Sequence, residues 1–141
     1  MNLLVRTGTC FLEPPGGQVT RNHPRTEDNR IRAMPKPAIQ ILVCNNERPP
    51  DAVKPSCGPR GALEVYRRFK DTVRARGIRD RVMVVRTGCL KHCSQGITVN
   101  IWPANTWYRR VTLDDVEEIV DRTVIGGEEI ERLRMPDVPW E

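Results

Sequence analysis

The sequence predicts a single α/β domain, in which helices flank a mixed β-sheet, preceded by a disordered tail. The length of 141 residues suits one domain with its own core. Short β-branched runs on either side of an amphipathic stretch indicate a β-α-β unit. The segment before them is dense in proline, glycine and charge, and it has little apolar surface to bury. We therefore expect a disordered extension at 1–37, the domain at 38–135 and a C-terminal tail at 136–141.

The first half of the domain is expected to form a strand, a helix and a second strand. The run AIQILVC, Ala38–Cys44, predicts a buried strand. After a proline-rich loop, residues 62–77 place apolar side chains at steps of three and four, and Gly77 is a suitable helix end. The run RVMVVRT, Arg81–Thr87, predicts the next strand. A helix that joins two strands of one sheet favours a right-handed crossover, so these strands should pair in parallel.

The second half is expected to add a hairpin and a helix. Residues Ile97–Trp102 and Trp107–Val111 flank the turn sequence PANT. Thr112 is a suitable N-cap for the helix, with Asp115 in the reciprocal capping position. The sequence EEIERLR then predicts a short helix. The order β-α-β-β-β-α is that of a thioredoxin-like domain, because the hairpin adds antiparallel strands to a parallel pair.

Composition argues against several classes of function. The net charge of +5 permits nucleic-acid binding, but no basic run is interleaved with aromatic residues as a stacking surface requires. No apolar run approaches the roughly 20 residues that a membrane-spanning helix needs. The N-terminus lacks the apolar core of a secretion signal, and an alternative start at Met34 would remove most of the tail. We expect a cytoplasmic protein, whose cysteines more often bind metals or catalyse than form disulfides.

Four cysteines form two pairs within the predicted domain, while Cys10 lies in the tail. The pairs are Cys44-x12-Cys57 and Cys89-x3-Cys93, and each begins where a predicted strand ends. If the two strands are neighbours, both loops leave the same edge of the sheet and the four thiols converge.

Three kinds of thiol chemistry can be compared with this spacing. Structural zinc sites use four cysteines, usually in pairs two to four residues apart, which makes the longer gap unusual. A thioredoxin-type dithiol requires Cys-x-x-Cys, which the chain lacks. A [2Fe–2S] cluster takes four thiolates and accepts them from separate loops. The residues alone leave the cluster and zinc as alternatives.

The stretches VCNNERPPDAVKPSCGPRGA and RTGCLKHCSQGITVNIWP resemble the thioredoxin-like [2Fe–2S] ferredoxins, which are related to the small cluster-carrying subunit of respiratory NADH dehydrogenases. The resemblance covers Ile39–Leu133. It implies a one-electron carrier, not an enzyme, that exchanges electrons with a reductase and an acceptor protein and forms a homodimer. It also implies the four cluster ligands: Cys44, Cys57, Cys89 and Cys93.

Residues around the cysteines are expected to support the cluster. Three glycines should let backbone amides face sulfur: Gly58, Gly88 and Gly96. Three basic side chains should add positive charge: Arg60, Arg86 and Lys91. We expect His92 to be an exposed side chain that tunes charge, since four cysteines already complete the ligand set. Trp102 and Trp107 are expected to pack on a face of the sheet.

Two alternative functions are also compatible with the sequence. One is an electron-transfer subunit of a multi-component oxidoreductase, although GPRGA is not a nucleotide-binding glycine motif. The other is a structural zinc-binding interaction module. For a free carrier, an oxidised cluster with four thiolates contributes a charge of about −2 and lowers the net charge to about +3. We therefore expect partners with an acidic docking patch.

Overall fold

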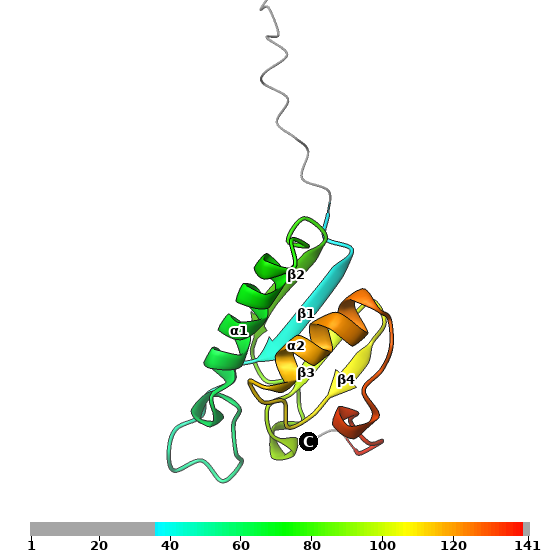
Figure 1. The fold of residues 1–141 in the computed structure, drawn as a ribbon. Coiled ribbons are helices and arrows are strands. Elements are labelled where there is room, and N and C mark those ends of the chain that lie inside the picture. The colour runs from blue at the N-terminus through cyan, green and yellow to red at the C-terminus, as the bar shows by residue number, and fades with distance from the viewer. Residues whose placement is uncertain (1–35, 140–141) are drawn as a thin grey trace, which may run out of the picture. The chain divides into compact units, whose positions relative to one another are not determined.

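A four-stranded mixed sheet organises the computed structural model, which describes residues 36–139 (Figure 1). The strands lie in the order β2-β1-β3-β4, with β2 parallel to β1 and the other neighbours antiparallel. Their bounds are Ile39–Cys44 for β1, Val82–Thr87 for β2, Val99–Trp102 for β3 and Thr106–Tyr108 for β4. The predicted thioredoxin-like mixed sheet, including the parallel pairing of its first two strands, is confirmed.

Two helices cover one face of this sheet (Figure 1). Helix α1, Ala62–Ala75, packs on β1 and β2, and α2, Asp115–Glu118, continues as a π-helix over Ile119–Ile125. Three 3-10 turns complete the fold: Gly58–Arg60, Cys93–Gln95 and Glu131–Leu133. The last of these forms in the sequence EEIERLR, where a short helix is predicted.

The core lies between the sheet and the helices because alternate strand residues face α1 and α2. Ile41 and Val43 of β1 are fully buried, and they pair across the sheet with Ile101 and Val99 of β3. Helix α1 contributes its apolar stripe to the same core: Ala62, Val65, Phe69 and Val73. Gly77 follows the helix in a left-handed conformation, with φ of +66°, as expected for a helix end.

The hairpin is shorter than predicted. Strand β4 ends at Tyr108, whereas the sequence predicts strand structure to Val111. Arg110 adopts a φ of +50°, which is incompatible with extended backbone. The free edge of β4 is instead covered by the later chain, since Arg109 N–H donates to the Leu133 carbonyl at 2.8 Å.

The start of α2 bears out the predicted contact between Thr112 and Asp115, but the helix begins at Asp115 and its N-cap is Asp114, not Thr112. The N–H and hydroxyl of Thr112 both donate to Asp115 Oδ2, at 2.8 and 2.7 Å, which is the reciprocal half of a capping box. Within residues 36–139, no helix is long and apolar enough to cross a membrane. The predicted disordered extension, with Cys10, lies largely outside the described residues.

Candidate metal centre

The ends of β1 and β2 position the two cysteine pairs. Cys44 is the last residue of β1 and lies in register with Thr87, the last residue of β2. The pairing continues one step further, since Asn45 N–H donates to the Thr87 carbonyl at 3.0 Å. Both strands therefore release their loops at the same edge of the sheet, toward the lower end of the domain in Figure 1.

All four thiols meet at this edge. The sulfur atoms of Cys44, Cys57 and Cys93 lie within 4.8 Å of one another. Cys89 Sγ lies 3.2 Å from Cys93 Sγ and so completes the group. The first three side chains are buried, with 1% or less of each exposed, whereas Cys89 is half-buried. Among the four cysteines, Cys89 is therefore the one nearest to solvent.

Hydrogen-bond donors surround the most exposed sulfur. Lys91 N–H donates to Cys89 Sγ at 3.3 Å, and the Arg48 guanidinium donates to the same atom at 3.5 Å. Arg48 is itself held by the loop, because its N–H donates to Ser56 Oγ at 3.2 Å and Nη1 donates to the Pro55 carbonyl. Sequence reasoning missed Arg48, which has no periodic or motif context in the proline-rich loop.

The local environment lowers the pKa of two of the thiols and raises the pKa of the other two. The neighbouring Cys57 thiol lowers the pKa of Cys44 to about 6, whereas the same contact and burial raise the pKa of Cys57. Burial also raises the pKa of Cys93. Burial opposes ionisation of Cys89, but its hydrogen bonds with Cys93 and Lys91 and the charge of Arg48 lower its pKa overall. Cys44 and Cys89 are thus the thiols most readily converted to thiolates, the form that binds metals.

Two expectations about flanking side chains, the exposure of His92 and the packing of Trp102, are wrong. His92 is not exposed: only 5% of it is accessible, and its ring meets Trp107 edge-on at 5.8 Å between centroids. The His92 ring therefore packs against the hairpin at Trp107 and is not a solvent-exposed side chain. Trp102 is 53% exposed and does not pack as expected, because the described helices cover the other face of the sheet.

Only some of the flanking basic residues and glycines contact the cysteines. Arg60 Nη1 donates to the Cys93 carbonyl at 2.9 Å, while Arg86 lies over the ring of Tyr66. Gly96 has a φ of +84°, which favours glycine, and its carbonyl accepts from Cys57 Sγ at 3.2 Å. The amide of Gly58 donates to the Asn46 carbonyl and not to sulfur.

The donor set restricts the chemistry of the site. Four converging thiols suit soft metal centres, and both tetrahedral zinc and a [2Fe–2S] cluster accept four cysteine thiolates. The burial of three sulfurs limits solvent at the centre, while the half-buried fourth leaves one edge accessible. The residues present therefore fit a [2Fe–2S] cluster.

Comparison with known proteins favours a [2Fe–2S] cluster over zinc. No family model matches the chain. A 2Fe-2S ferredoxin of Clostridium pasteurianum is 36% identical over 102 residues, which cover 72% of this chain and all of that protein. A 2Fe-2S ferredoxin of Aquifex aeolicus is 35% identical over 94 residues, covering 66% and 85%. The crystal structure of the wild-type thioredoxin-like [2Fe-2S] ferredoxin from Aquifex aeolicus superposes with a TM-score of 0.68 at 32% identity, covering 72% and 100%.

Proposed function

The chain belongs to the thioredoxin-like [2Fe–2S] ferredoxins, and on this basis we propose that Cys44, Cys57, Cys89 and Cys93 hold its [2Fe–2S] cluster. The convergence of the four sulfur atoms is the observation that carries the proposal. When bound, such a cluster accepts and releases one electron at a time. The protein is accordingly an electron carrier and not an enzyme.

The residues of the site have distinct tasks in this function. The buried thiolates of Cys44, Cys57 and Cys93 hold the centre in a region that excludes water. Reduction adds one negative charge to the site. The Arg48 guanidinium and the Lys91 N–H face Cys89, where they stabilise that added charge.

The carrier needs a reductase and an acceptor, and we propose that both present acidic docking surfaces. The basic net charge supports this, because such encounters are weak and electrostatically steered. We also propose a homodimer in the cytoplasm. The exposed Met83 and Trp102 leave apolar surface on the sheet that a second copy could cover, and free thiols suit a reducing compartment.

The cluster can be tested directly on anaerobically purified protein. We expect a red-brown protein with two irons and two sulfides per chain, whose visible absorption bleaches on addition of dithionite. Cys57→Ser should lose or alter this spectrum, whereas Cys10→Ser, the matched control, should retain it. A colourless protein with one zinc per chain would overturn the proposal in favour of the zinc module. Co-purification with a flavoprotein would instead support the role of an oxidoreductase subunit.

A further inference from the structure

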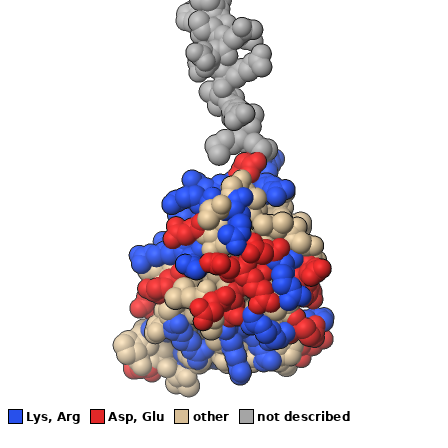
Figure 2. All heavy atoms as spheres, viewed as in Figure 1, with Lys and Arg blue, Asp and Glu red and all other residues tan. Residues whose placement is uncertain are grey.

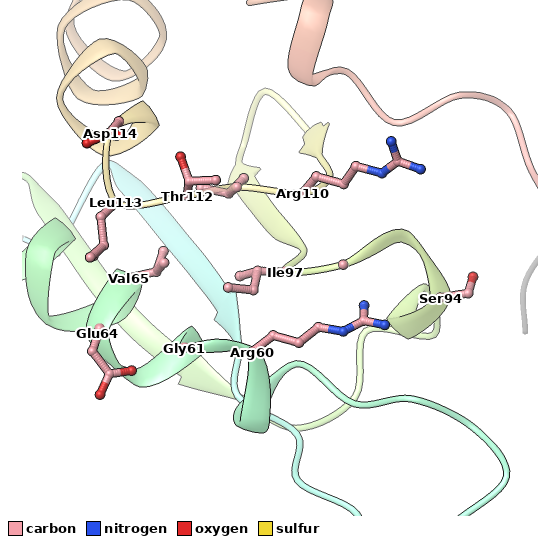
Figure 3. A pocket seen from close by; sticks show the side chains of 12 residues that line it. Arg60, Gly61, Glu64, Val65, Ser94, Ile97, Arg110, Thr112, Leu113 and Asp114 are labelled. Atoms are coloured by element: carbon pink, nitrogen blue, oxygen red, sulfur yellow. The ribbon is translucent and has the colours of Figure 1, made fainter.

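A groove of about 760 Å³ lies beside the segment that follows Cys93, and Figure 3 shows the side chains that line it. It is formed by the start of α1, the segment that follows Cys93 and the segment between β4 and α2. Its apolar lining comes from the buried Val65, Ile97 and Val111 and from Leu113, which is 47% exposed. Arg60 and Arg110 also line it. An accessible apolar surface next to basic groups has the composition of a protein-docking site.

One wall of the groove belongs to the loop of residues 88–98, called here the cysteine loop. Arg60 Nη1 donates to the Cys93 carbonyl at 2.9 Å. Gly96 lines the groove, and its carbonyl accepts from Cys57 Sγ at 3.2 Å. Arg110 N–H donates to the Gln95 carbonyl at 3.1 Å, which fixes Arg110 to the same loop. A protein seated in the groove would therefore be separated from two of the thiols by little more than this loop.

Positive and negative side chains lie at opposite ends of the groove. In Figure 3 the guanidinium groups of Arg60 and Arg110 extend toward the side of Ser94, whereas Glu64 and Asp114 lie at the opposite side. Figure 2 shows Lys and Arg side chains at the lower end of this face, with Asp and Glu gathered above them and further Lys and Arg near the top of the domain. The groove thus has a basic end near the cysteine loop and an acidic end at the helix starts.

We infer that this groove is the docking surface for a redox protein whose contact face presents a carboxylate beside an apolar side chain. The carboxylate pairs with Arg60 and Arg110, and the apolar side chain packs on Leu113. The opposite charges at the far end fix the orientation, because a reversed partner would meet like charges. This inference rests on the proposed function, since it concerns how the carrier exchanges its electron.

The test uses cluster-loaded protein and an acidic model acceptor, oxidised plastocyanin, in a stopped-flow experiment. One electron passes from the reduced ferredoxin to Cu(II), giving Cu(I), and no proton is transferred. We expect Arg110→Glu to lower the second-order rate about tenfold at low ionic strength. The matched control is Arg79→Glu, an exposed site before β2 at the opposite end of the parallel strands from the thiols. It changes the net charge equally and should lower the rate by less than about twofold.

Two further measurements test the apolar contact and the charge contact separately. Leu113→Ser should slow the reaction with plastocyanin several-fold without changing its salt dependence, because it removes only apolar contact. Cytochrome c, a basic acceptor, should react with Arg110→Glu no more slowly than with wild type. Equal slowing by Arg110→Glu and Arg79→Glu would overturn the inference, since net charge alone would then explain the rates. Failure of the proposed function would be visible beforehand, as a preparation without a reducible visible spectrum.

Discussion

Arg48 reaches the thiols from the loop that separates Cys44 from Cys57. Its guanidinium contacts a sulfur 41 residues away in the sequence, so its role depends on how the whole loop folds back. The contacts of the Arg48 N–H with Ser56 and of its side chain with Pro55 hold that fold. A charged donor on a cysteine sulfur stabilises the more negative state of a cluster. Arg48 is thus placed to favour reduction.

The substitution Arg48→Met is expected to lower the reduction potential. It keeps an unbranched apolar stem and removes the donor, so the reduced form loses a charge-assisted hydrogen bond of about 1 kcal/mol, or roughly 40 mV for one electron. The potential is measured by dye-mediated redox titration followed by visible absorption. Lys54→Met is the matched control, because it removes one positive charge from the same loop at an exposed position. Equal shifts in both variants would show that the contact with Cys89 has no specific effect.

The second helix ends at a tightly packed glycine. The π-helix over Ile119–Ile125 closes at Gly126, whose N–H donates to the Asp121 carbonyl at 3.1 Å. A Cβ added at Gly126 would lie 2.6 Å from the Arg122 carbonyl oxygen, closer than real side chains approach. The sequence predicts a helix here but not its π form, because apolar spacing does not distinguish the two hydrogen-bond patterns.

Gly126→Ala is expected to destabilise the fold by about 2 kcal/mol, because the backbone at the helix end must shift to admit the methyl group. Gly127→Ala provides the comparison. Its site has a φ of +72° but open space around it, so only the strain of about 1 kcal/mol applies. Both values come from urea unfolding followed by circular dichroism. A smaller loss for Gly126→Ala than for Gly127→Ala would contradict the crowding argument.

At the scale of the whole molecule, parallel pairing of β1 and β2 brings the two cysteine pairs together. This arrangement was predictable from the sequence. Local periodicity identifies the two strands, the crossover rule makes them parallel, and each cysteine pair begins at the end of one of them. The burial of His92, the early end of β4 and the contact of Arg48 were not predictable. Each depends on contacts between distant segments, for which one sequence contains no local pattern.

Ion pairs hold the second helix to α1 and to the final 3-10 turn. Arg76 of the α1 end pairs with both carboxylate oxygens of Asp121 at 2.7 Å. Arg132, from the final 3-10 turn, pairs with Asp115 at 2.6 Å and with Glu118. Asp115 is the most buried of these carboxylates, with 10% of its side chain exposed. A buried charge destabilises the fold when it lacks a partner. The free energy of unfolding should therefore respond to the ionisation of Asp115.

The Asp115 carboxyl is expected to make the stability of the domain depend on pH. Burial opposes its ionisation, but hydrogen bonds from Arg132 and Thr112 prevail and lower its pKa. Its contribution is therefore present above the unfolded-state pKa of about 3.9 and is lost as pH falls through the lower folded-state value. Asp115→Asn, which keeps an acceptor for Thr112, should cost about 1 kcal/mol at pH 7 and clearly less at pH 2, because the contribution fades only as pH falls toward the lowered folded-state pKa. Urea unfolding of both proteins at each pH measures the difference, with the exposed Asp80→Asn as control. A gap between Asp115→Asn and wild type that is equally large at both pH values would exclude this carboxylate as the cause.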